Sequence, residues 1–270
     1  MKLAELSLLE KTIEEAEFVL VGLGEEWWVQ PDEIKKIEKY RLLYERLEKA
    51  GQLERGIPFW IALYYENEIP HKLAFAYQNL HTLLKNKNYF IVSKTLDPYL
   101  KKYGFIEEKY VNPCGNHEFL QCTEKCGSRL VAVKEMIADL EEYLNKICEN
   151  EGLENKCKCI DCGSRLVFNN IYAEKYSQAG YEKKWEIYMK WLQGTVNKKL
   201  AVLELGVGMN FPTVIRWPFE KTVLYNQKST FFRINETLSM LTPEISERGY
   251  SRSENSVDTI LACKKNNISL

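Results

Sequence analysis

Two close pairs of cysteines constrain this sequence more than any other feature. Cys122 and Cys126 are separated by three residues, Cys159 and Cys162 by two, and a glycine follows each pair directly. Four thiolates offered from two tight turns suit tetrahedral zinc, and a closed four-thiolate site leaves no position for water. The spacing therefore predicts a structural zinc site that joins two segments lying far apart in the chain.

The other cysteines leave one alternative open. Cys157 lies beside the second pair and competes with it as a ligand, although the two residues between Cys159 and Cys162 favour that pair. Cys148 and Cys263 are interpreted as small hydrophobic residues. The alternative to a zinc site is a set of unrelated free or buried thiols.

Composition narrows the class of protein. The 37 Lys and Arg nearly balance the 38 Asp and Glu, so no net charge favours nucleic acid or an anionic membrane as a partner. No apolar run is long enough to span a bilayer, and residues 1–11 lack the features of a secretory signal. We therefore expect a cytoplasmic protein, in which eight cysteines are metal ligands, catalytic thiols or buried residues rather than disulfides.

Short apolar runs alternate with amphipathic segments along the chain. Helical spacing is typical of residues 31–50, 70–86, 131–148 and 172–192, and a short helix is expected within 253–264. Strands are predicted at Phe18–Val21, Tyr89–Val92, Ala201–Leu205, Val223–Tyr225 and Phe231–Ile234, with a weaker one around Tyr110 and Val111. This alternation predicts an α/β fold with a doubly wound, largely parallel sheet.

Two of the predicted strands run into glycine turns. Gly22-Leu23-Gly24 follows the first and resembles part of a dinucleotide-binding fingerprint, but Trp27 stands where the third glycine is expected. Glu25 and Glu26 would repel a pyrophosphate there unless they point away. A simple turn between strand and helix is the alternative. The second turn, Gly206-Val207-Gly208, would face the same crevice and favours a bound ligand.

The order of these features resembles the sirtuins, in particular the bacterial branch often encoded beside macrodomain proteins. The resemblance covers residues 15–262 and is carried by Asn88-Tyr89-Phe90-Ile91-Val92, Leu120-Gln121-Cys122 and the segment from Leu203 to Pro212. It implies a Rossmann-like nucleotide-binding domain formed by residues 1–30, 86–118 and 168–270. A smaller domain would contain a helical module at 31–85 and a zinc-binding module at 119–167.

The resemblance also implies site residues and cofactors. NAD would be lined by Gly22, Leu23, Gly24, Gly206, Val207, Gly208, Asn210 and Asn235. Asn235 also has a simpler interpretation as a turn-forming residue. The sirtuin segment Thr-Gln-Asn-Ile-Asp reads here Ser93-Lys94-Thr95-Leu96-Asp97, so Asp97 is kept and Thr95 replaces the Asn that handles the nicotinamide ribose.

The usual general base is missing from the position where sirtuins carry it. Sirtuins have His before a Gly, the macrodomain-linked branch tends to have Gln, and this chain has Cys114-Gly115. Without a base, deacylation loses a factor of about 10²–10⁴. Cys114 is either a nucleophile with a stabilised thiolate or an inert thiol, and the nearby His117 is interpreted as a surface or packing residue.

Two hypotheses about function follow. The first is a divergent, weakly active sirtuin-like NAD-dependent deacylase or ADP-ribosyltransferase, with an acylated or lipoylated carrier protein and a macrodomain protein as partners. Cys114, Asp97 and Thr95 would be its catalytic residues. The second is a catalytically inactive module of the same fold that binds NAD, ADP-ribose or a protein partner.

Overall fold

The structure is a computed structural model of the 270-residue chain. It describes residues 3–29, 35, 36, 38, 41, 42, 45, 49, 71–127, 129–133 and 158–263. Cys148, Cys157 and most of the predicted helices at 31–50 and 131–148 lie outside the described residues.

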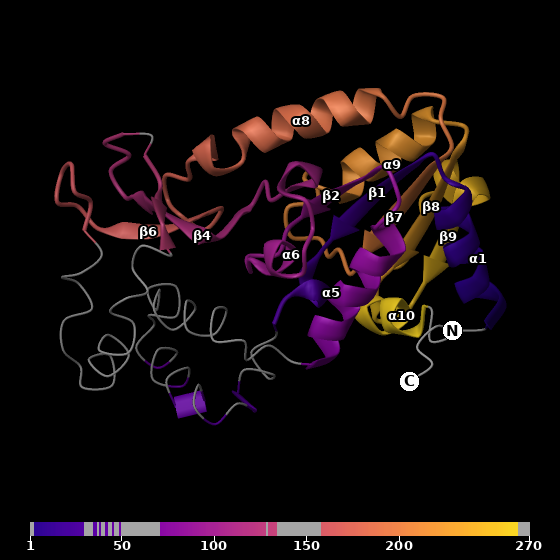
Figure 1. Cartoon of the computed structure of the whole chain (residues 1–270), viewed down its shortest axis with the longest axis horizontal. Helices are drawn as coiled ribbons and strands as arrows, with labels where there is room; N and C mark the ends of the chain where they lie inside the picture. Colours follow the sequence, from indigo (N-terminus) through magenta and orange to yellow (C-terminus); the bar gives the residue numbers. More distant parts are fainter. Residues whose placement is uncertain are drawn as a thin grey trace.

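A six-stranded sheet forms the larger layer of the molecule (Figure 1). Its order is β3 (Tyr110–Val111), β2 (Tyr89–Ser93), β1 (Phe18–Leu23), β7 (Leu200–Leu205), β8 (Ser229–Ile234) and β9 (Gly249–Arg252). Every neighbouring pair is parallel. The chain winds outward from β1 to β3 and then outward again from β7 to β9, so the strand order reverses between β1 and β7. This is the point where ligands bind in folds of this class.

Helices cover both faces of this sheet. The helices α1 (Leu3–Glu15), α5 (His71–Leu84) and α10 (Ser256–Ala262) pack on one face, and α8 (Glu182–Gln193) and α9 (Arg216–Tyr225) pack on the other (Figure 1). Side chains of β1 alternate between the two cores: Val19 and Val21 lie in the first and Leu20 in the second. The predicted doubly wound α/β fold is confirmed. A short helix, α6 (Tyr99–Lys102), follows β2.

A second sheet holds the cysteine pairs. It is three-stranded and antiparallel, in the order β5 (Val131–Ala132), β4 (Gly115–Cys122) and β6 (Leu166–Asn170). It lies away from the large sheet, beyond the N-terminal end of α8 (Figure 1). The division of the chain into Rossmann-like, helical and zinc-binding parts stays a prediction, since most of the helical module lies outside the described residues.

Several predicted elements differ from those observed. Val223–Tyr225, predicted as a strand, is the last turn of α9, because Phe219 and Val223 are four residues apart and both face the sheet. The helix predicted at 172–192 begins only at Glu182, and Val131 begins a short strand rather than a helix. The short edge strand β9 was not predicted, because only four residues form it and none is fully buried.

Candidate functional site

The two glycine turns meet at the point where the strand order reverses. The Gly24 N–H donates to Leu205 O at 3.0 Å, and the Glu26 N–H donates to Gly206 O at 3.3 Å. A Cβ atom on Gly24 would lie 2.3 Å from Val207 Cα, which is backbone and cannot yield as a flexible side chain could. Gly206 has a φ of 64°, in the left-handed region that favours glycine. The close contact of the two turns therefore depends on both glycines.

Three of the residues predicted to line NAD are buried in the packing of the sheet. Gly22 lies inside β1, and a Cβ atom there would lie 2.5 Å from Ile215 Cγ2 and 2.9 Å from the Phe219 ring, so this glycine makes room for α9. Leu23 and Val207 are fully buried in the cores on either face. Their contribution to a ligand site would come through the backbone.

Trp27 closes the first turn instead of a third glycine. Residues 25–27 form a single 3-10 turn, and no α-helix starts there. The Trp27 indole is fully buried, donates through Nε1 to Ser256 Oγ at 3.0 Å, and meets the Tyr77 ring edge-on at 5.0 Å. The indole is thus packed between α5 and α10.

The two acidic side chains of this turn point towards the neighbouring loops. Glu25 Oε2 accepts the Gly208 N–H at 2.7 Å, and Glu25 Oε1 lies 2.8 Å from Lys94 Nζ. Glu26 accepts the backbone N–H groups of Glu236 at 2.8 Å and Ser256 at 2.6 Å. Backbone donors that could meet a phosphate at this edge of the sheet are therefore engaged by carboxylates of the chain itself.

Lys94 is a site residue that sequence reasoning missed. It follows β2 directly, its side chain is 4% exposed, and Nζ donates to Asn210 O at 2.5 Å in addition to its ion pair with Glu25. Its position in the sequence could have identified it, because a lysine at the carboxyl end of a parallel strand lies at the edge of the sheet where ligands bind. Asn210 itself is exposed and contributes its backbone carbonyl here.

Thr95 and Asp97 are buried at the same edge. Thr95 Oγ1 lies 2.8 Å from Ser93 Oγ. Asp97 Oδ1 accepts the Tyr99 N–H at 3.2 Å and the Tyr77 hydroxyl at 3.4 Å, while Asp97 Oδ2 has no hydrogen-bond partner among the described residues. Burial raises the pKa of Asp97 to about 8, although these hydrogen bonds oppose the shift. The carboxyl group is thus largely protonated at neutral pH.

Neither Cys114 nor His117 offers a base suited to neutral pH. Burial raises the pKa of the Cys114 thiol to about 11, and the smaller effect of Lys94 in the opposite direction does not offset it. The His117 ring is buried against Phe168, with ring centroids 4.1 Å apart, and burial lowers its pKa to about 3. The interpretation of His117 as a packing residue agrees with this environment.

Asn235 organises the loop after β8. Its Oδ1 accepts the N–H groups of Thr237 at 3.0 Å and Leu238 at 2.7 Å, which is the geometry of a turn-forming Asn. Its backbone N–H donates to Arg252 O at 3.0 Å, joining the loop to the end of β9. A contact between Asn235 and a ribose stays a prediction.

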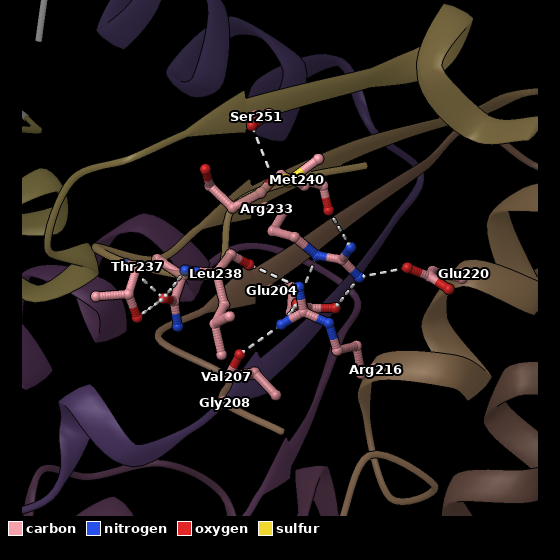
Figure 2. A network of polar contacts seen from close by, with 12 residues as sticks. Glu204, Val207, Gly208, Arg216, Glu220, Arg233, Thr237, Leu238, Met240 and Ser251 are labelled. Carbon is pink, nitrogen blue, oxygen red and sulfur yellow. Dashed lines mark hydrogen bonds and ion pairs between the residues drawn. The ribbon is translucent and has the colours of Figure 1, made fainter. Parts of the chain in front are cut away.

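A buried cluster of four charges lies next to these loops (Figure 2). Arg233 on β8 binds both carboxylate oxygens of Glu204 on β7, at 2.7 and 2.9 Å, and also pairs with Glu220 on α9 at 2.8 Å. Arg216 on α9 lies 3.5 Å from Glu204 and donates to the backbone carbonyls of Val207 at 2.8 Å and Leu238 at 2.6 Å. The cluster has no net charge and ties α9 to both loops.

The four predicted zinc ligands come together at one end of the small sheet. All four Sγ atoms lie within 4.8 Å of one another; Cys122 and Cys162 are 3.5 Å apart, and Cys126 and Cys159 are 3.4 Å apart. Tetrahedral zinc with Zn–S bonds of about 2.3 Å separates its sulfur atoms by roughly 3.8 Å, so the set fits such an ion. Gly163 makes the sharp bend after the second pair with a φ of 73°, whereas in the first pair Lys125, not Gly127, takes the left-handed conformation.

A cavity of about 440 Å³ lies between the small sheet and the edge of the large one. Trp28, Leu96 and Phe168 provide apolar walls, and Gln121 and Asn170 line it with amide groups. Leu96 comes from the segment after β2, and its neighbours Thr95 and Asp97 do not line the cavity. Among the described residues, no helix combines the length and apolar character that crossing a membrane requires.

No family model matches the chain. Over 154 residues it is 29% identical to a probable bifunctional ADP-ribose hydrolase/ADP-ribosyltransferase of Fusarium oxysporum, covering 55% of this chain and 26% of that relative. It is 19% identical to a protein ADP-ribosyltransferase of Staphylococcus aureus, covering 98% of this chain and 89% of the relative. The chain thus spans about a quarter of the length of the Fusarium protein.

Solved structures with a similar backbone are sirtuins. Sir2Tm bound to a propionylated peptide superposes with a TM-score of 0.55 at 14% identity and 96% coverage of both chains. Sir2 bound to an acetylated peptide gives a TM-score of 0.54 at 15% identity and 96% coverage of both. A Sir2 homolog–NAD complex gives 0.50 at 14% identity, covering 94% of this chain and 90% of the other. The expected sirtuin fold is confirmed.

Proposed function

We propose that this chain, which has the fold of the sirtuins, is a weakly active NAD-dependent transferase that passes ADP-ribose to a protein acceptor. The observation that carries the proposal is the meeting of the Gly24 and Gly206 turns at the reversal of strand order, with the buried Asp97 at the same edge of the sheet. The names of the two relatives, one a probable bifunctional ADP-ribose hydrolase/ADP-ribosyltransferase and the other a protein ADP-ribosyltransferase, support the same chemistry.

The residues present fit NAD in part. The Gly24 and Gly206 turns offer backbone at a crevice of the right class, and Asn235 lies at the end of the neighbouring strand. Bound NAD would supply an ADP-ribosyl group joined to a nicotinamide leaving group. Because Asp97 Oδ1 already accepts two hydrogen bonds, we place the proton on Oδ2, which is closed to solvent and would donate to a ligand amide once the neighbouring side chains move aside. Thr95 would lie beside it.

The side chains near this crevice favour transfer over deacylation. Deacylation by sirtuins requires a base that activates a ribose hydroxyl, and neither the Cys114 thiol nor the His117 ring has a suitable pKa. Transfer of ADP-ribose to a protein takes its nucleophile from the acceptor, so it does not depend on that base. Cys114 is then an inert, buried thiol.

The proposal is tested by incubating the purified chain with NAD and an acceptor protein while measuring nicotinamide release and label transfer. Wild type is expected to release nicotinamide slowly. Asp97→Ala, which removes the Oδ2 donor, is expected to slow release by at least tenfold, whereas Asp97→Asn, whose amide donates from the same position, should keep most of it. Deacylation of an acetylated peptide should stay at background. Calorimetry that detects no NAD binding at millimolar ligand would refute the proposal.

We also propose that zinc occupies the site of Cys122, Cys126, Cys159 and Cys162. The close approach of four thiols, with none of them in a disulfide, supports a closed tetrahedral site. Its role would be structural, because such a site has no open position for a substrate or water.

A second candidate function is a binding module that has lost catalysis. The hydrogen bond from the Gly208 N–H to Glu25 and the raised pKa of Cys114 favour it. Binding of NAD or ADP-ribose without turnover would identify such a module, whereas turnover abolished by Cys114→Ala would contradict it. Two of the similar structures carry acylated peptides, which supports a protein ligand. An acylated or lipoylated carrier and a macrodomain protein remain proposals, to be tested by direct binding.

A further inference from the structure

We infer that Lys94 and the Gly208 N–H form a binding site for a phosphate group of a nucleoside diphosphate, and that Glu25 fills this site as a competing ligand until the phosphate displaces it. This inference deepens the proposed function and rests on it. It names two residues, Lys94 and Glu25, that set how tightly the crevice holds an anion.

The site is built from the ends of three neighbouring strands. Glu25 follows β1 by two residues, Lys94 follows β2 directly, and Gly208 belongs to the turn after β7. These strands are adjacent and parallel, so their carboxyl ends converge where ligands bind in doubly wound folds. Residues far apart in the chain thus come together at the place expected for an anionic ligand.

Lys94 is held in this position more firmly than Glu25 is. The Lys94 side chain is 4% exposed and donates to Asn210 O, and its ammonium group needs a nearby negative charge because burial of an unpaired charge is costly. The Glu25 side chain is 31% exposed, so its carboxylate can rotate into water. An arriving phosphate would replace the Glu25 carboxylate and keep the charge of Lys94 neutralised.

Gly208 leaves room for an anion to approach the backbone. Its N–H lies 2.7 Å from Glu25 Oε2, and a Cβ atom there would lie 3.2 Å from the same oxygen. A carboxylate and a phosphate both accept short hydrogen bonds from a backbone N–H and a lysine. The carboxylate of Glu25 therefore stands in for a ligand oxygen in both contacts.

The charge of Glu25 should reduce affinity for diphosphates and leave affinity for uncharged ligands unchanged. At an effective dielectric of about 20, two like charges roughly 4 Å apart repel strongly, and partial exposure of Glu25 leaves only a fraction of that effect. We expect Glu25→Gln to bind ADP-ribose about tenfold more tightly than wild type does. Lys94→Gln, made in the Glu25→Gln background, should reverse that gain.

Calorimetry on the full chain with ADP-ribose and with adenosine tests the inference. Adenosine carries no phosphate, so its affinity should not change in Glu25→Gln. The matched control is Glu17→Gln, which removes the same charge just before the opposite end of β1, where Glu17 binds the Lys199 N–H. It should leave both affinities unchanged. If Glu25→Gln does not fold, Glu25→Ser removes the same carboxylate and takes its place.

The inference is overturned if loss of the Glu25 carboxylate leaves ADP-ribose affinity unchanged, or if Glu17→Gln raises it equally. Its failure is distinguishable from failure of the proposed function, because binding and nicotinamide release are measured separately. Variants that bind as expected and never release nicotinamide would remove the proposed function and retain this site. If Glu25→Gln releases nicotinamide slowly but binds ADP-ribose no more tightly than wild type does, the proposed function is retained and this phosphate site is removed.

Discussion

Replacing Arg233 by Met should strongly destabilise the chain. The Arg233 side chain is 1% exposed and makes two hydrogen bonds to Glu204, one ion pair to Glu220 and one hydrogen bond to Met240 O (Figure 2). Met has a similar length and no charge, so the substitution removes these partners with little change in volume. Among the described residues, the fully buried Glu204 would then keep Arg216, at 3.5 Å, as its one ion-pair partner.

The expected loss follows from the burial of the pair. Removing one partner of a buried ion pair costs about 3–5 kcal/mol, because the remaining charge is left uncompensated. For a chain of this size that corresponds to a fall in Tm of roughly 6–20 °C. Burial already raises the pKa of Glu204 against the opposing effect of Arg233, so its carboxyl group should take up a proton in the variant.

Urea and thermal unfolding followed by circular dichroism measure this loss. The control is Lys72→Met, which breaks a pair with Asp258 at the similar distance of 2.8 Å but with side chains 55% and 57% exposed. It should cost less than about 1 kcal/mol. Adding Glu204→Gln to Arg233→Met should restore part of the stability, since the buried charge is then gone. Equal losses in the Arg233 and Lys72 variants, or a double variant that loses the sum of the single effects, would refute the reasoning.

Four further predictions concern the metal, the thiol and the pH dependence of stability. Elemental analysis should find about one zinc per chain. The zinc should be lost in Cys162→Ser and kept in the control Cys263→Ser, whose thiol lies outside the cluster. Zinc retained by Cys162→Ser would contradict the site. In the folded protein, the Cys114 thiol should react with iodoacetamide at pH 7.5 at least tenfold more slowly than free cysteine, as mass mapping can show, because burial raises its pKa to about 11. The stability supplied by neutral His117 is complete above pH 6.5 and is lost as pH falls towards 3. His117→Gln should therefore make the free energy of unfolding fall less steeply as pH is lowered through this range. Asp97 acts in the opposite direction, because burial raises its pKa. The stability that its neutral carboxyl group supplies is complete below about pH 4 and is lost as pH rises to about 8, so Asp97→Asn should remove this dependence of stability on pH.

The sequence predicts the sheet well because its strands are buried on both faces. Residues 18–23, 89–93 and 200–205 are nearly continuous apolar runs, and buried parallel strands require that pattern. The cysteine cluster was equally readable, since two pairs of cysteines at this spacing seldom occur in a chain that does not bind a metal. Both signals are local in sequence, and local signals need no knowledge of the fold.

What the sequence did not predict depends on contacts between distant residues. Glu25 and Lys94 are 69 positions apart, and Glu204 and Arg233 are 29 apart, so neither pairing is visible before the strands are placed. The strands β4 and β6 were also missed, because β4 contains polar residues such as Asn116 and Glu118 and lacks a simple alternation. Val223–Tyr225 was predicted wrongly because three apolar residues cannot distinguish a strand from the end of a helix.

The second glycine turn is held from two sides by interactions that differ in burial. From the α9 side, Arg216 binds Val207 O within a cluster whose central Glu204 and Arg233 are almost fully buried, so that contact is fixed. From the β1 side, Glu25 binds the Gly208 N–H with a side chain that reaches solvent, so that contact can exchange. A ligand phosphate can therefore replace Glu25 while the turn keeps its position. It follows that substitutions of Glu25 should change affinity and also lower stability, because they leave the buried Lys94 without its paired charge, whereas substitutions in the buried cluster should act on stability first.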